Sequence, residues 1–227
     1  LAKQAKKLGI KVLYYISPKI WAWRAGRIEQ IKRYVDHMAV LFPFEQEIYE
    51  KAEVAVTCVG HPLVDAVHTQ LSKTAAREKF LLDKDIRVIG LFPGSRRSEI
   101  SVLLPVMLEA AERIEKRHFP IQIVIPQAPG IDESFLQQYL AGSCLNVRVI
   151  KDDFYEVIQA CDAIVAASGT VTLEIALLGV PHFITYKVSP WSYRILKRLV
   201  KIPYVGLCNI VTKQPVIKEL LQDDVTP

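Results

Sequence analysis

The stretch LFPGSRRSEI, Leu91 to Ile100, joins a short apolar run to a long amphipathic segment. The run before it, residues 86–92, has the composition of a buried strand. After it, apolar residues recur at helical spacing and predict one helix over residues 98–118. These residues are Ile100, Leu103, Leu104, Met107, Leu108, Ala111 and Ile114. A strand, a tight turn and a helix in this order are typical of an α/β sheet.

The turn in this stretch has the features of a phosphate site. It directs the free backbone N–H groups and the positive dipole end of the following helix beyond the strand. Arg96 and Arg97 add charge there, and a guanidinium can hold a phosphate with two hydrogen bonds. We therefore predict that Gly94, Ser95 and Arg96 bind a diphosphate. A glycine before a basic helix start also occurs in α/β proteins that bind nothing there, so this stretch alone leaves both interpretations open.

The regions around this stretch predict a parallel sheet. Strands are expected at 86–92, 121–125, 146–150, 163–166 and 181–185, and helices at 98–118, 132–140, 153–160 and 170–178. Alternating strands and helices with short connections favour a parallel sheet that is covered on both faces. The polar stretch 70–84 precedes this pattern, and we place a domain boundary there, with domains at 1–72 and 73–227.

The two ends of the chain are less regular. In the first domain we expect strands at 10–16 (buried), 37–42 and 54–59, and helices at 3–8, 28–35 and 43–52. After the parallel sheet we expect helices at 190–200 and 216–221, with an irregular stretch at 203–212 between them. The chain starts at Leu1 without a methionine and ends in a sequence that should open a helix, so we expect a fragment of a longer protein.

Composition narrows the class of protein. Of the 227 residues, 51% are hydrophobic and 23% are charged, which excludes a disordered or fibrous chain. The apolar stretch 163–186 contains glycine, proline, threonine and glutamate, so it predicts strand, turn, helix and strand instead of a membrane span. The four cysteines form no CxxC pair, which indicates a reducing compartment and no metal site. The net charge of +5 suits anionic partners, but no nucleic-acid motif is present.

A second turn has the same sequence pattern as the first. The segment 162–181 predicts a strand, the small-residue turn Ser168-Gly169-Thr170, and a helix. Glu174 lies four residues after Thr170, which is one residue too far for a capping box. A carboxylate there can accept hydrogen bonds from a ribose diol. Two such turns at one sheet edge predict a nucleoside diphosphate site, and the lack of GxxxxGK[ST] and GxGxxG argues against P-loop and dinucleotide enzymes.

The first domain offers weaker signals. The stretch SPKIWAWRAGR, 17–27, could face a membrane or stack on a ligand, although buried packing is the favoured interpretation. His61 follows a predicted strand, where open α/β sheets bind ligands, but its neighbours have no triad or metal spacing.

Several motifs together resemble one known family. They are SPKIWAWRAGR (17–27), LFPFE (41–45), VGHPLVD (59–65), LFPGSRRSEI (91–100), ASGTVTLEIALLGVP (167–181) and YVGLCNIV (204–211). In this order they are similar to lipid-A-disaccharide synthase, a glycosyltransferase family of the GT-B architecture. The resemblance implies two Rossmann-like domains, the N-terminal one incomplete in this chain. Residues 1–72 would belong to the acceptor-side domain and 73–227 would bind the UDP-sugar donor.

The resemblance also implies a reaction and a place. The enzyme would transfer 2,3-diacylglucosamine from UDP-2,3-diacylglucosamine to 2,3-diacylglucosamine 1-phosphate, with inversion, to give lipid A disaccharide 1-phosphate and UDP. It would need no cofactor or metal. It would be cytoplasmic and bind peripherally to the anionic inner face of the inner membrane of a Gram-negative bacterium, and a homodimer is left open.

The resemblance assigns roles to residues of the donor half. UDP would be bound by Gly94, Ser95, Arg96, Ser168, Gly169, Thr170, Glu174 and Asn209. The family has a Leu-Pro-Asn segment where this chain has Cys208 before Asn209, so the local backbone can differ. The catalytic base of the family would lie upstream of Leu1, so we expect this chain to bind UDP and to be inactive alone.

Two other functions stay open at this point. A GT-B transferase that uses UDP-N-acetylglucosamine would share the turn at 168–170 and Glu174. A non-catalytic UDP-binding or assembly fragment would fit the absence of a recognisable base.

Overall fold

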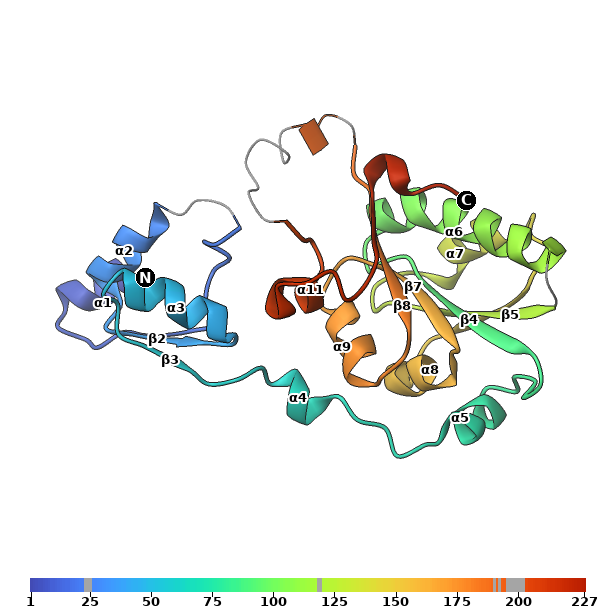
Figure 1. The fold of residues 1–227 in the computed structure, drawn as a ribbon, viewed down its shortest axis with the longest axis horizontal. Helices are drawn as coiled ribbons and strands as arrows, with labels where there is room; N and C mark the ends of the chain where they lie inside the picture. The colour runs from blue at the N-terminus through green and yellow to red at the C-terminus, as the bar shows by residue number, and fades with distance from the viewer. Residues whose placement is uncertain (23–25, 118–119, 190, 192, 195–202) are drawn as a thin grey trace. The chain divides into compact units, whose positions relative to one another are not determined.

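The computed structural model describes residues 1–22, 26–117, 120–189, 191, 193–194 and 203–227 (Figure 1). The chain forms two compact units. One contains Leu1–Ala66, and the other contains Val67–Tyr193 and Tyr204–Pro227.

The first unit is built on three parallel strands in the order β1-β2-β3. The strands are β1 (Leu13–Tyr15), β2 (His37–Val40) and β3 (Val56–Cys58). The helices are α1 (Ala2–Lys7), α2 (Arg27–Tyr34), α3 (Pro43–Lys51) and α4 (Leu63–Ala66). Met38, Val40 and Tyr49 are fully buried in its core. The Tyr49 hydroxyl finds a partner in Ser17 Oγ at 2.8 Å, so this buried polar group is satisfied.

One prediction for this unit is wrong in part. The strand expected at 10–16 covers only Leu13–Tyr15, and all three of its residues are exposed instead of buried. Strand β1 pairs with β2 alone, so it forms an edge of the sheet. The apolar composition of 10–16 correctly predicted a strand, but composition does not report which strands have neighbours on both sides.

The second unit contains six parallel strands in the order β6-β5-β4-β7-β8-β9. They are β4 (Arg87–Phe92), β5 (Ile121–Pro126), β6 (Asn146–Ile150), β7 (Ala163–Ala167), β8 (His182–Tyr186) and β9 (Glu219–Leu221). Counted from β4, this is the strand order of a doubly wound, Rossmann-type sheet. The chain reverses direction across the sheet between β4 and β7, and such a switch point is where these folds bind ligands.

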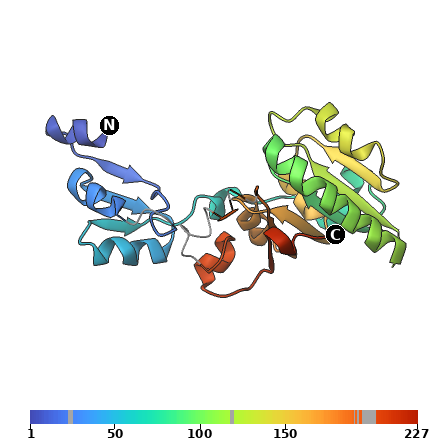
Figure 2. The ribbon, with the colours of Figure 1, turned by 90° about the horizontal axis from the view of Figure 1, so that it is seen from above.

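Helices cover both faces of this sheet (Figure 1). They are α5 (Lys73–Lys79), α6 (Arg97–Arg117), α7 (Glu133–Leu140), α8 (Phe154–Ala160), α9 (Val171–Leu177) and α11 (Leu207–Thr212), followed by the 3₁₀ turn η1 (Gln222–Asp224). Strand β5 shows why both faces are buried: Ile123 and Ile125 pack with α6 and α7, whereas Val124 packs with α8 and α9. Figure 2 shows α6, the long green helix, lying along one face. The predicted parallel sheet is confirmed.

The end of the chain differs from the prediction. Residues 216–221 were expected to be helical, but Glu219–Leu221 form β9, which pairs in parallel with β8. This short mixture of apolar and charged residues suits either structure, and the available edge of β8 decides it. The stretch 203–212 was expected to be irregular, yet Leu207–Thr212 form α11. Most of the helix predicted at 190–200 lies outside the described residues.

Candidate functional site

A cleft of about 670 Å³ lies at the carboxyl ends of β4, β5, β6 and β7 in the second unit. We call it the switch-point cleft, because β4 and β7 flank the reversal in strand order. Its lining comes from residues 92–96, 126–129, 150–154 and 167–171, together with Glu99. Four loops that are distant in sequence therefore contribute to one concave surface, as expected for a ligand site of an open α/β sheet.

The loop after β4, residues 93–96, leads directly into α6 and is called the β4 loop below. Gly94 has a φ of +112°, a conformation that residues with a side chain rarely adopt. A Cβ atom at this position would also overlap the carboxyl group of Glu99. Ser95 and Arg96 are exposed and line the cleft. Glycine is thus required both by the backbone turn and by a side chain that folds back over it.

Glu99 is the partner of the β4 loop. Its Oε2 accepts a hydrogen bond from the Ser95 N–H at 3.1 Å, and its Oε1 accepts one from Arg96 Nη1 at 2.6 Å. Sequence reasoning missed this residue. The available signal was its spacing, since a side chain three or four residues into a helix can reach back to the turn that precedes it.

The next arginine of the motif has a different role. Arg97 donates from Nη2 to Asp132 at 2.5 Å, and its guanidinium lies 4.7 Å from the ring centre of Phe135. These contacts join the start of α6 to the start of α7. Arg97 does not belong to the lining of the cleft. Of the two adjacent arginines, Arg96 is therefore the one placed to meet a ligand.

The loop after β7, residues 168–170, is called the β7 loop. It lies between β7 and α9, and all three of its residues line the cleft. The backbone is fixed by a hydrogen bond from Ser168 N–H to the Thr185 carbonyl at 2.8 Å. Thr172 Oγ1 donates to the Gly169 carbonyl at 2.9 Å. The structure thus brings six of the eight predicted donor residues to one cleft, and their role in binding stays a prediction.

The other two predicted residues, Glu174 and Asn209, do not belong to this lining. Glu174 Oε1 accepts a hydrogen bond from the Tyr155 hydroxyl at 3.2 Å. Burial raises the pKa of this hydroxyl above its ordinary value, and the Glu174 charge raises it further, so the hydroxyl keeps its proton and donates the hydrogen bond to Glu174.

Asn209 is fully buried and bonded to its own chain. Its Nδ2 donates to the Ile217 carbonyl and to Glu219 Oε1, both at 2.7 Å, and its Oδ1 accepts from Ile217 N–H at 2.9 Å. These bonds connect α11 to the segment that becomes β9. Cys208, at the position where the sequence resemblance implies a proline, is buried in the same helix. Asn209 therefore fixes the local backbone.

The remaining part of the cleft comes from the loops after β5 and β6. Gln127 N–H donates to the Ile150 carbonyl at 2.7 Å, which joins these two loops. Asp153 has a φ of +59° and forms an ion pair with Lys79 at 2.7 Å. Phe154, at the start of α8, packs edge-on against Phe92. Sequence reasoning assigned none of these residues to the site, although loops that follow parallel strands are expected at the same edge.

The described residues contain neither a metal-binding cluster nor a membrane-spanning helix. Across residues 1–22, 26–117, 120–189 and 203–227 no three His, Cys, Asp or Glu side chains are grouped so that they could hold a metal ion. No described helix combines the length and apolarity that crossing a bilayer requires.

The first unit has a cluster of aromatic rings at the carboxyl ends of its strands. Phe44 stacks on Phe42 and meets Trp21 edge-on, and His61 lies 5.2 Å from Phe42, measured between ring centres. Trp21 Nε1 donates to the buried carboxylate of Glu45 at 3.1 Å. The predicted packing role fits Trp21, whereas Trp23 and Arg24 of the same motif lie outside the described residues.

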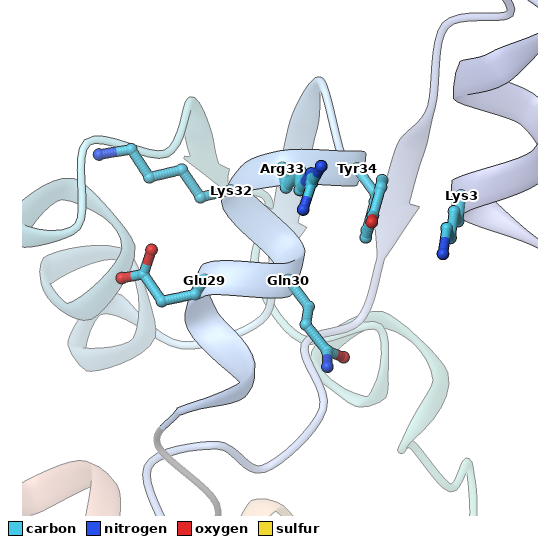
Figure 3. A pocket seen from close by; sticks show the side chains of 6 residues that line it. All are labelled: Lys3, Glu29, Gln30, Lys32, Arg33 and Tyr34. Atoms are coloured by element: carbon cyan, nitrogen blue, oxygen red, sulfur yellow. The ribbon is translucent and has the colours of Figure 1, made fainter.

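A second hollow, of about 660 Å³, lies in the first unit and is lined by one residue of α1 and five of α2 (Figure 3). Lys32 is paired with Glu53, and Arg33 lies over the ring of Tyr34. The last turns of α2 precede the amino end of β2, so this hollow is away from the carboxyl ends of the strands. The hollow therefore does not lie at the carboxyl edge of the sheet, where α/β folds bind their ligands.

A sequence model described as lipid-A-disaccharide synthetase matches residues 1–227. The chain belongs to this family. Lipid-A-disaccharide synthase of Geobacter metallireducens is 52% identical over 226 residues, covering 100% of this chain and 59% of that protein. The enzyme of the same name from Coxiella burnetii is 49% identical over 227 residues, covering 100% of this chain and 60% of that protein. The chain thus spans about three fifths of the length of these curated relatives.

Solved structures agree on the fold. UDP-GlcNAc 2-epimerase from Neisseria meningitidis, in a crystal structure bound to UDP-GlcNAc, has a TM-score of 0.56 at 16% identity, over 93% of this chain and 62% of that chain. The crystal structure of Acinetobacter baumannii MurG has a TM-score of 0.51 at 17% identity, over 98% of this chain and 56% of that chain. Together with the parallel sheets, these likenesses confirm the predicted α/β fold of GT-B type.

Proposed function

We propose that this chain is the donor-binding part of an inverting glycosyltransferase of lipid A biosynthesis. The enzyme transfers 2,3-diacylglucosamine from UDP-2,3-diacylglucosamine to 2,3-diacylglucosamine 1-phosphate, and releases lipid A disaccharide 1-phosphate and UDP. The observation that carries this proposal is the switch-point cleft, with the β4 and β7 loops facing it, in a chain of the lipid-A-disaccharide synthetase family. Residues 73–227 form the donor domain and 1–72 belong to the acceptor side.

The donor diphosphate binds between the two loops. The diphosphate lies beside Gly94, where it accepts from the Ser95 N–H, from Arg96 and from the N–H groups at the start of α6, while Ser168, Gly169 and Thr170 approach from β7. A departing UDP gains negative charge, and fixed donors of this kind stabilise it. The Neisseria epimerase, which has the same fold, is bound to UDP-GlcNAc in its crystal structure, and this supports a uridine nucleotide as the ligand.

Two residues act from the edge of the site. Glu174 accepts hydrogen bonds from the ribose hydroxyls, and the Tyr155 hydroxyl holds its carboxylate in place. Asn209 is a positioning residue, because its side chain fixes α11, which packs beside α9. No metal is assigned a role in this proposal.

The finer partners belong to the same proposal. We propose that the enzyme binds peripherally to the cytoplasmic face of the inner membrane of a Gram-negative bacterium, and the acyl chains of both sugars support binding at a membrane surface. Lysines at 3, 7 and 11 of the first unit are exposed and give it positive charge toward an anionic surface. A homodimer would be compatible with this arrangement.

The test is UDP titration by calorimetry into the full-length protein that contains this chain. Arg96→Ala removes the charged donor of the cleft, and we expect UDP binding to weaken about 10- to 100-fold. Arg117→Ala is the matched control, since it makes the same change at the far end of the same helix and should leave the affinity within about twofold. UDP binding that is equal in the parent and in Arg96→Ala would contradict the donor site.

Turnover assays separate the candidate functions. UDP-2,3-diacylglucosamine should be a substrate of the full-length protein and UDP-N-acetylglucosamine should not. The reverse preference would identify a UDP-N-acetylglucosamine transferase. UDP binding without turnover of either sugar would leave a non-catalytic UDP-binding module as the answer.

A further inference from the structure

The β4 loop already holds an anion that belongs to the chain itself. The carboxylate of Glu99 accepts from Ser95 N–H at 3.1 Å and from Arg96 Nη1 at 2.6 Å. It also fills the space beside Gly94, where a Cβ atom would overlap it. These are the same donors, and the same open side of the glycine, that the proposed function gives to the donor diphosphate.

One N–H group cannot serve two anions at once. Ser95 has a single backbone donor, and Glu99 uses it. A phosphate beside Gly94 would also lie next to the Glu99 carboxylate, and like charges at that distance repel. Arg97 cannot take over from Arg96, since it is held by Asp132 and lies over Phe135. A diphosphate and the Glu99 carboxylate therefore exclude each other at this loop.

The Glu99 side chain is also exposed enough to move away from the β4 loop. Its side chain is 32% exposed and that of Arg96 is 76% exposed, so both lie at the mouth of the cleft. An ion pair between an exposed loop residue and the first turn of the following helix is weak, because water screens it and competes for both groups. A rotamer change of one side chain is enough to free Ser95 N–H and Arg96.

We propose that Glu99 is an internal competitor for the phosphate position of the donor site. The diphosphate displaces the carboxylate and takes over its two donors, and the carboxylate returns when UDP departs. Glu99 therefore lowers the affinity for UDP and speeds its release. This proposal rests on the proposed function, which places a nucleoside diphosphate in the switch-point cleft.

The experiment uses the full-length protein and three ligands: UDP, uridine and inorganic pyrophosphate. Glu99→Gln keeps an oxygen that can accept from Ser95 N–H but removes the charge. We expect UDP and pyrophosphate to bind about tenfold more tightly to this variant. Uridine, which has no phosphate, should stay within about twofold of the parent. Glu109→Gln is the matched control, because Glu109 lies on the same helix, pairs with Arg113 and is outside the cleft.

A second variant and a rate make the test independent of small folding defects. Glu99→Ala should also tighten pyrophosphate binding, and thermal unfolding without ligand identifies any loss of fold. Stopped-flow displacement should show slower UDP release from Glu99→Gln than from the parent. A merely structural Glu99 would instead give weaker binding and unchanged or faster release.

The outcomes separate this proposal from the donor assignment. Pyrophosphate that binds Glu99→Gln no more tightly than the parent, or that binds neither, overturns the competitor role. If UDP binds no better than pyrophosphate in both proteins, the uridine donor site is wrong. In that case the pyrophosphate ratio between Glu99→Gln and the parent still decides the role of Glu99.

Discussion

The ion pairs at the two ends of the neighbouring strands β4 and β7 differ in how far they are buried. At the amino end, Asp162 accepts from Lys73, from Arg77 and from the Val88 N–H, and the Arg77 side chain is only 10% exposed. At the carboxyl end, the ion pair of Arg96 with Glu99 lies at the surface. The amino end thus carries a shielded network that joins α5, β4 and β7. The carboxyl end carries a pair that a ligand can break.

This contrast assigns stability to one end and binding to the other. A partly buried ion pair that loses one partner leaves a charge without compensation, which costs free energy of folding. An exposed pair contributes little to folding, so its groups are available for a ligand. The same two strands can therefore be rigid at one edge and adaptable at the other.

The largest effect is expected at the amino end. Asp162→Ala leaves Arg77 buried without its carboxylate, and we expect the free energy of unfolding to fall by about 3 kcal/mol. Denaturant unfolding of the full-length protein measures this change. The UDP affinity of the folded fraction should stay within about twofold of the parent. A large loss of UDP affinity without a loss of stability would break the division between the two ends.

The pH dependence sharpens the same point. Burial alone would raise the pKa of Asp162, but the Lys73 and Val88 hydrogen bonds and the Arg77 charge outweigh it and hold the pKa below its ordinary value. Its contribution to stability is therefore present above the pKa of the unfolded chain and is lost as the pH falls through the lower folded value. Below a pH of about 4, the parent should lose its stability advantage over Asp162→Asn. Unfolding curves in acid that stay a constant distance apart would contradict this.

The two loops of the cleft differ in their glycines, which gives the next prediction. Gly94 has a φ of +112° and faces Glu99, whereas a Cβ added at Gly169 would meet no atom within 4 Å beyond its two chain neighbours. We expect Gly94→Ala to lower the free energy of unfolding by about 1–2 kcal/mol. Gly169→Ala should change it by less than about 0.5 kcal/mol. Thermal or denaturant unfolding of the two variants compares them directly, and equal losses would show that Gly94 is no more constrained than Gly169.

Sequence reasoning recovered the second unit well, because its strands and helices are long and periodic. Residues 100–114 show helical spacing over several turns, and the loops after 86–92 and 163–166 could be placed at one edge by topology alone. It failed where neighbours decide the structure. β9 forms because β8 offers an edge, and β1 is exposed because it pairs on one side only.

The same limit applies to the site. The β4 and β7 loops could be predicted because small residues directly after an apolar strand, with arginine in the first of them, are typical of a turn that binds phosphate. Glu99 was missed because a sequence shows a charge but not the groups that it meets. Asn209 was assigned to UDP by resemblance, yet its amide is bonded to Ile217 and Glu219. Helices and strands repeat their apolar residues at a regular spacing in the sequence, whereas contacts between side chains leave no such pattern.

The smallest predicted effect tests how Glu174 takes part. Tyr155→Phe removes the hydroxyl that donates to Glu174 at 3.2 Å. If Glu174 accepts the ribose hydroxyls, UDP and uridine should both bind about two- to threefold more weakly. The loss is small because the Tyr155 hydroxyl does not contact the ribose and only positions the carboxylate that does. Pyrophosphate binding should not change, since pyrophosphate has no ribose. Tyr139→Phe on α7 is the control, because Tyr139 packs against Phe135 away from the cleft lining. Equal weakening of all three ligands would contradict a role at the ribose and would show that Tyr155 acts through the packing of α8 against the sheet.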